Sequence, residues 1–156
     1  MIIINQSLVD RALVLVRPTA EEILSAGGMT WGPLWVEGVV SAPGLLRNPL
    51  FRFGRFAEWD PEWGEKKDFM EVAMCKFRLA KRLRMNTSVA ITLYPWLLEE
   101  GDYLYPGGVY RDGIACGISG AKGRVDEGLS EMVVTAIIIL ANLEADARKE
   151  NKQMKV

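Results

Sequence analysis

The sequence predicts a single α+β domain over residues 1–156, in which an antiparallel-rich sheet of about five strands is covered by helices. Three observations support this prediction. A chain of 156 residues has the length of one ordinary domain. Hydrophobic residues make up 49% of the chain and charged residues 25%, as in globular proteins. Apolar residues recur at helical spacing near both ends and in the middle, with shorter strand-like runs between them.

The predicted order of elements is α-β-β-α-β-β-β-α. A helix is expected at about 6–26, where Pro18 breaks the pattern into two pieces and Thr19 caps the second. Apolar faces at helical spacing predict two more helices, at about 65–85 and from about 126 to beyond 148. The expected strands are 34–41, 50–56, 88–98, 103–111 and 114–119.

The last predicted helix is apolar on more than one face. Val134, Ile138 and Ile139 widen its apolar surface well beyond one stripe. A helix that is apolar nearly all round is buried on more than one side. In a domain of this size, we expect the second side to contact another copy of the chain. The sequence therefore predicts a homo-oligomer.

Composition argues against several classes of function. With 19 basic and 20 acidic residues the formal net charge is −1, so a nucleic-acid partner is not expected. The chain has no histidine, which removes the commonest general base and the commonest metal ligand. Cys75 and Cys116 cannot form a zinc site by themselves and lie in apolar surroundings, which is typical of structural thiols. We predict no metal site.

The N-terminus and the most apolar stretch bear on location. The first residues have no basic region ahead of an apolar run, so no signal peptide is predicted. The most apolar stretch, 132–141, is shorter than the roughly 18 residues that cross a bilayer. We therefore expect a cytoplasmic protein without a membrane partner.

Four short motifs follow one another in the second half of the chain. They are Tyr105-Pro106-Gly107-Gly108-Val109, Asp112-Gly113, Gly117-Ile118-Ser119-Gly120 and Val125-Asp126-Glu127. In this combination the chain resembles the GlcG/HbpS family of haem-binding-like domains, with Lys76 matching a lysine of the family's middle helix. The resemblance covers roughly residues 34–147 and implies the fold of that family.

The resemblance supports the family's fold better than it supports haem binding. Some haem-binding members of the family are described with histidine participation, and this chain has no histidine. Between the first two strands, residues 41–44 read Ser-Ala-Pro-Gly, where the family usually has Asp followed by Gly-Gly. We therefore leave the cofactor unassigned.

Lys76 is the most unusual single residue. Helical spacing places it in the middle of the core-facing stripe of the second helix, although a buried lysine costs several kcal/mol unless it is paired or neutral. Asp126 and Glu127 are its expected partners. Two interpretations stay open: a structural ion pair, or a site residue with a lowered pKa.

Further candidate site residues have competing structural interpretations. Gly107 and Gly108 either satisfy turn dihedrals or line a ligand with their N–H groups. Tyr105 is either a packed aromatic residue or an acid–base group. The candidate catalytic residues are Lys76, Tyr105 and Glu37. The candidate ligand-binding residues are Arg52, Lys76, Tyr105, Gly107, Gly108, Asp126 and Glu127.

Three functions remain open at this point. The first is an oligomeric GlcG/HbpS-like protein that binds a small, largely apolar or planar ligand, haem-like ligands without histidine ligation included. The second is an enzyme of lyase, isomerase or cyclase type on the same fold, using lysine, tyrosine and carboxylate groups. The third is a scaffold whose apolar and basic helices bind a protein partner. Fold resemblance alone does not decide between them.

Overall fold

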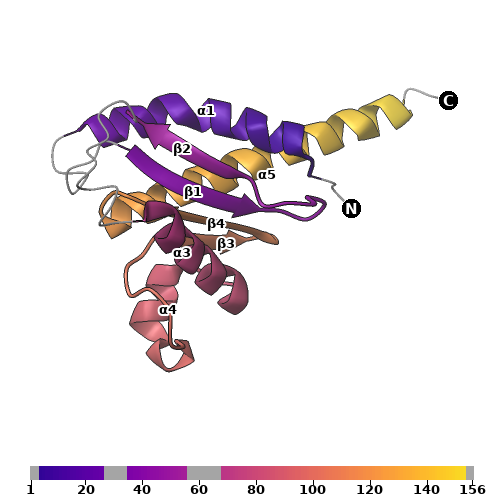
Figure 1. The fold of residues 1–156 in the computed structure, drawn as a ribbon. Coiled ribbons are helices and arrows are strands. Elements are labelled where there is room, and N and C mark those ends of the chain that lie inside the picture. Colours follow the sequence, from indigo (N-terminus) through magenta and orange to yellow (C-terminus); the bar gives the residue numbers. More distant parts are fainter. Residues whose placement is uncertain (1–3, 27–34, 56–67, 154–156) are drawn as a thin grey trace.

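The computed structural model describes residues 4–26, 35–55 and 68–153 (Figure 1). Four antiparallel strands form one sheet in the order β2-β1-β4-β3. Helices α1 and α5 cover one face of this sheet, and α3 covers the other. The α+β class is therefore confirmed, with four strands in the described residues rather than about five. The strands are β1 (Trp35–Ser41), β2 (Leu50–Gly54), β3 (Gly108–Arg111) and β4 (Ile114–Ser119).

The helices follow the predicted pattern near both ends and in the middle of the chain. They are α1 (Gln6–Ser25), α3 (Phe69–Leu83), α4 (Thr87–Leu93), the short 3₁₀ helix η2 (Pro95–Leu97) and α5 (Gly123–Gln153). The expected start of the second helix at 65 lies outside the described residues. In Figure 1, α4 lies below α3 and away from α1.

The core lies mainly between the sheet and the pair α1 and α5. Val36 and Val40 of β1 point into it, together with Ile118 of β4. Val39 points to the opposite face, where it packs with Phe77 of α3. Both central strands are thus buried on both faces, which explains why they lack the alternation of apolar and polar residues that one-sided strands show.

Helix α3 approaches the sheet very closely at a glycine. A Cβ atom added at Gly117 of β4 would lie 2.6 Å from the backbone nitrogen of Phe77, and would also meet the carbonyl oxygen of Ala73. Only a residue without a side chain allows this approach. As a consequence, the α3 residues between Ala73 and Phe77, including Lys76, lie directly against the ends of β3 and β4.

The strand predicted at 88–98 is wrong. These residues form α4 and η2, because bonds from distant elements hold the start of α4 in place. The side chain of Asn86, the N-cap residue, makes no capping bond, and instead Glu127 of α5 accepts a hydrogen bond from the Ser88 N–H at 3.3 Å. The predicted strand 103–111 is shortened to β3 as well.

The predicted break at Pro18 is also wrong, since α1 continues through it, and Thr19 caps no second piece. Pro18 lies on the exposed face of the helix, where the carbonyl it leaves unpaired can meet water. Buried residues on both sides of it, Val16 and Ala20, pack in the core and hold the helix together.

The hairpin predicted at Asp112-Gly113 is confirmed. It joins β3 to β4, with Arg111 opposite Ile114. Both turn residues have positive φ, 52° and 81°, as a two-residue turn of this kind requires.

Helix α5 differs from its prediction in two respects. Val134 is fully buried in the core of its own chain and Ile138 packs against that core, so of the three residues expected to face another copy only Ile139, 53% exposed, presents substantial apolar surface outward. By length and composition, the segment Gly123–Lys152 could cross a membrane. The most apolar stretch, 132–141, is only part of this helix, which continues well beyond it.

Candidate functional site

Lys76 and Asp126 form a buried ion pair. The Lys76 Nζ atom lies 2.8 Å from Asp126 Oδ2, and the two side chains are 3% and 1% exposed. Lys76 also donates a hydrogen bond to the carbonyl oxygen of Ile118 at 3.2 Å. The predictions that Lys76 points inward and pairs with an acid are both confirmed.

Asp126 is held by the start of α5. It lies in the first turn of this helix, and its Oδ1 accepts a hydrogen bond from the Ala121 N–H at 2.9 Å. Burial raises the pKa of Asp126 to about 6, although the Lys76 ammonium and the backbone donors act in the opposite direction. The carboxyl group therefore titrates near neutrality, where acid–base chemistry is useful.

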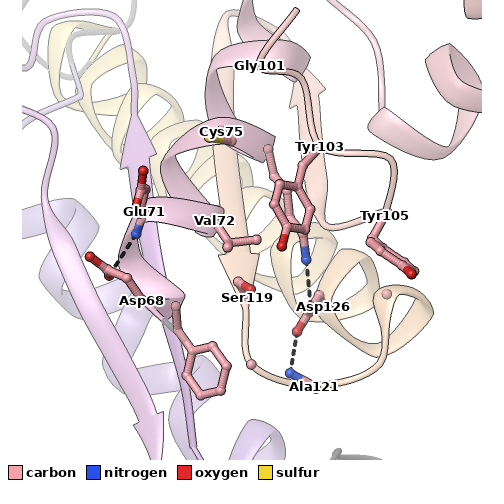
Figure 2. A pocket seen from close by; sticks show the side chains of 14 residues that line it. Asp68, Glu71, Val72, Cys75, Gly101, Tyr103, Tyr105, Ser119, Ala121 and Asp126 are labelled. Atoms are coloured by element: carbon pink, nitrogen blue, oxygen red, sulfur yellow. Dashed lines mark hydrogen bonds and ion pairs between the residues drawn. The ribbon is translucent and has the colours of Figure 1, made fainter. Parts of the chain in front are cut away.

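The ion pair lies at the buried end of a pocket of about 780 Å³. Figure 2 shows this pocket between α3, the segment around Tyr103 and the turn that leads into α5. In Figure 2, the Tyr103 side chain points toward the part of the pocket that holds Val72 and Asp126, whereas Tyr105 points away from Asp126, and the two ring centroids are 6.1 Å apart. The described lining residues are Asp68, Phe69, Glu71, Val72, Cys75, Lys76, Gly101, Tyr103, Tyr105, Ser119, Gly120, Ala121, Gly123 and Asp126.

Gly107 and Gly108 stand behind Lys76 rather than in the pocket lining. Their N–H groups both donate to Thr87 Oγ1 at 3.0 Å, and Ser130 Oγ donates to the Gly107 carbonyl at 2.7 Å. A Cβ atom at Gly107 would lie 2.8 Å from Lys76 Nζ. The two glycines therefore make room for the lysine side chain, and their N–H groups are occupied.

Glu127 docks α4 onto α5. Its carboxylate accepts hydrogen bonds from the hydroxyl of Ser88 at 2.6 Å and from the N–H of the same residue. Burial raises the pKa of Glu127, whereas these two hydrogen bonds lower it. Lys76 thus pairs with the first member of the predicted Asp-Glu couple, and the second member caps a helix.

Glu37 and Arg52 form a separate pair on the sheet. Arg52 Nε donates to Glu37 Oε1 at 2.7 Å, between partners that face each other across β1 and β2. Neither is among the described residues that line the pocket. Of the candidate catalytic residues, the structure therefore brings Lys76 and Tyr105 to one pocket and places Glu37 outside that lining.

Sequence reasoning did not single out three lining residues. Ser119 is part of the Gly-x-Ser-Gly motif, whose glycines indicate either a turn or a ligand-lining loop but give the serine hydroxyl no role. Tyr103 is indicated only as one of four tyrosines whose phenols suit acid–base chemistry or weak iron ligation, and Cys75 carries no signal beyond its residue type. Cys75 is half-buried in the lining, whereas Cys116 is fully buried on the sheet, where burial raises the pKa of its thiol to about 12. Within the described parts of the chain, no group of three or more metal-ligating residues gathers.

No family model matches the sequence, no curated protein matches it, and no solved structure matches the chain. The function proposed below therefore rests on the motifs and on the geometry of the pocket.

Proposed function

We propose that the protein is an oligomeric GlcG/HbpS-like protein that binds a small, largely apolar or planar organic ligand in the pocket beside Lys76 and Asp126. The observation that carries this proposal is the buried ion pair at the end of a pocket of about 780 Å³. Small-molecule sites have volumes of roughly 300–1,000 Å³ and combine apolar walls with a few placed polar groups. Here Phe69, Val72 and Tyr103 supply apolar wall.

The arrangement of the motifs supports the grouping with the GlcG/HbpS family. The Pro-Gly-Gly turn packs behind Lys76, and the Asp-Glu pair opens α5 with Asp126 on the lysine. The Gly-x-Ser-Gly strand end contributes Ser119 and Gly120 to the lining. Three of these motifs thus lie around Lys76, which precedes them in the sequence and belongs to a different helix.

Haem-like ligands belong to this proposal only without histidine ligation. Of the side-chain types that usually ligate haem iron, the described lining holds the phenols of Tyr103 and Tyr105 and the thiol of Cys75. Tyr105 is 62% exposed and points away from the ion pair in Figure 2. This donor set fits an axially held haem poorly, and we assign no cofactor.

Self-association is supported by apolar residues that the described chain leaves exposed on α1 and α5. Val14 and Leu15 of α1 are 68% and 61% exposed, and Ile139 and Leu143 of α5 are 53% and 60% exposed. We expect these helices to contact another copy of the chain, in a cytoplasmic protein that binds neither nucleic acid nor membrane. Light scattering tests this, and a particle of the 17.4 kDa monomer mass across a wide concentration range contradicts it.

An acid–base enzyme on the same fold is the second candidate. The observation that favours it is the pKa of Asp126, raised to about 6 by burial, beside a lysine and a tyrosine that line the same pocket. These are the groups that a lyase, isomerase or cyclase uses to move protons on a bound organic substrate. Turnover of a retained ligand would favour this function over binding alone.

Native mass spectrometry of protein purified from its own source tests the proposal. We expect a retained small molecule in the wild type that is lost in Val72→Trp, in which the larger indole side chain occupies pocket space. The control is Lys81→Met, a change at an exposed position of the same helix. Retention of the same molecule by folded Val72→Trp protein contradicts binding in this pocket.

A further inference from the structure

The Ser119 hydroxyl is an unused polar group in the pocket. Ser119 is only 6% exposed and lines the pocket, and no residue in the described part of the chain forms a hydrogen bond with its side chain. Fully enclosed side-chain polar atoms in those residues all have partners, so the Ser119 oxygen reaches the pocket space. A buried hydroxyl without a partner is costly once a ligand excludes water. We therefore expect a ligand in this pocket to form a hydrogen bond with the Ser119 hydroxyl.

Lys76 has a donor left over at the same end of the pocket. An ammonium group has three N–H bonds, and two of them are used, by Asp126 Oδ2 and by the Ile118 carbonyl. Asp126 has a donor on each oxygen, because Ala121 N–H binds the other one. Among the described residues, the remaining Lys76 N–H and the Ser119 hydroxyl are therefore donors that a ligand can meet at the buried end of the pocket.

The charges of Lys76 and Asp126 limit which chemical group of a ligand can bind beside them. Lys76 and Asp126 neutralise each other, so an anion buried here meets no net positive charge, and a cation finds the carboxylate already occupied. Asp68 and Glu71 are exposed acids at the start of α3, where solvent screens their charges. A neutral acceptor oxygen fits this end of the pocket best.

We infer that the ligand presents a neutral carbonyl oxygen to Ser119 Oγ and Lys76 Nζ, with its planar body against Val72 and Tyr103. This inference rests on the proposed function, because it assumes that the pocket binds a small organic molecule. It assigns Ser119 as the residue that selects carbonyl compounds.

A matched pair of probes tests the inference. Acetophenone and α-methylstyrene have the same shape, but a CH₂ group replaces the carbonyl oxygen in the second. Binding of each is followed by NMR titration of the backbone amides of residues 119–123, which line the pocket or adjoin it. One net hydrogen bond predicts roughly 3- to 10-fold tighter binding of acetophenone to the wild type.

The variants separate the role of Ser119 from general effects. In Ser119→Ala, acetophenone should bind at most about twofold more tightly than α-methylstyrene, because a hydrogen bond worth about 1 kcal/mol is lost. The control is Ser41→Ala, which changes another buried serine at the far end of β1 and keeps the wild-type ratio. Benzoate and benzylamine, probes of similar size but opposite charge, are expected to bind more weakly than acetophenone.

Failure of the inference and failure of the proposed function give different results. If no probe shifts the amides of residues 119–123, the pocket does not bind such molecules and both fall. If the probes bind there but α-methylstyrene, benzoate or benzylamine equals acetophenone, the carbonyl inference is overturned and the binding function stands. An unchanged ratio in Ser119→Ala also overturns it.

Discussion

Replacing Lys76 with methionine probes the ion pair most directly. The substitution keeps an unbranched apolar stem beside Gly107 but removes the bonds to Asp126 and to the Ile118 carbonyl. Asp126 is then a buried carboxylate whose remaining partners are backbone N–H groups. Removing one partner of a buried pair costs about 3–5 kcal/mol, a large part of the roughly 5–15 kcal/mol that stabilises a domain.

A second substitution should recover part of this loss. In the double variant Lys76→Met with Asp126→Asn the buried charge is gone, whereas the amide oxygen of the new side chain can still accept from the Ala121 N–H. We expect the free energy of unfolding of the double variant to lie about 1–2 kcal/mol below that of the wild type. Urea denaturation followed by tryptophan fluorescence measures all three proteins.

The loss in Lys76→Met should depend on pH. In the folded protein, burial raises the pKa of Asp126 from 3.8 to about 6, and Lys76 lowers it, so removing Lys76 raises it further. A raised folded pKa contributes stability that is complete below the unfolded pKa and is lost as pH rises through the folded one. The variant therefore regains stability relative to the wild type as pH falls from 7 to 5.

Lys81→Met, a change at an exposed position, is the control. Its free energy of unfolding should stay within about 0.5 kcal/mol of the wild-type value and should not show this pH dependence. A deficit of Lys76→Met below about 1 kcal/mol at pH 7 would refute the cost assigned to the unpaired Asp126. A deficit that grows as pH falls would refute the assignment of the titrating group.

Three further predictions concern other parts of the molecule. A thiol reagent should label Cys75 in the native protein and spare Cys116, whose pKa burial raises to about 12; equal labelling under native conditions would contradict this. Gly117→Ala should lower the urea midpoint by the equivalent of about 1–3 kcal/mol, because its Cβ atom would press on the backbone of α3, and an unchanged midpoint would show that α3 can move away. A haem titration should not show bis-nitrogen axial ligation, since the chain has no histidine, and the absorption spectrum checks this.

Some of the site could be predicted from the sequence because the signals are local. Helical spacing places Lys76 on the same face as buried apolar residues, and the cost of burying an ammonium implies an acid partner. Asp112-Gly113 specifies its hairpin because both residues tolerate positive φ. Spacing and turn chemistry depend on neighbours in the chain, so they can be recognised without the fold.

Other features depend on partners that only folding supplies. The β-branched residues after Asn86 suit a strand or a helix locally, and Glu127, about forty residues later in the chain, caps the helix that forms. Pro18 stays within a helix because residues on both sides of it are buried in the core.

The difference between what local sequence signals determine and what folding decides is clearest at the pocket. The amino-acid sequence by itself determined that Lys76 would be buried and would need an acid. The tertiary structure decided that Asp126 pairs with it while Glu127 caps α4, that Glu37 pairs with Arg52 instead, and that the Ser119 hydroxyl stays unpaired within the described residues. The physical reason is that hydrophobic periodicity is a property of one segment. Which polar group meets which depends on how segments from all parts of the chain pack together.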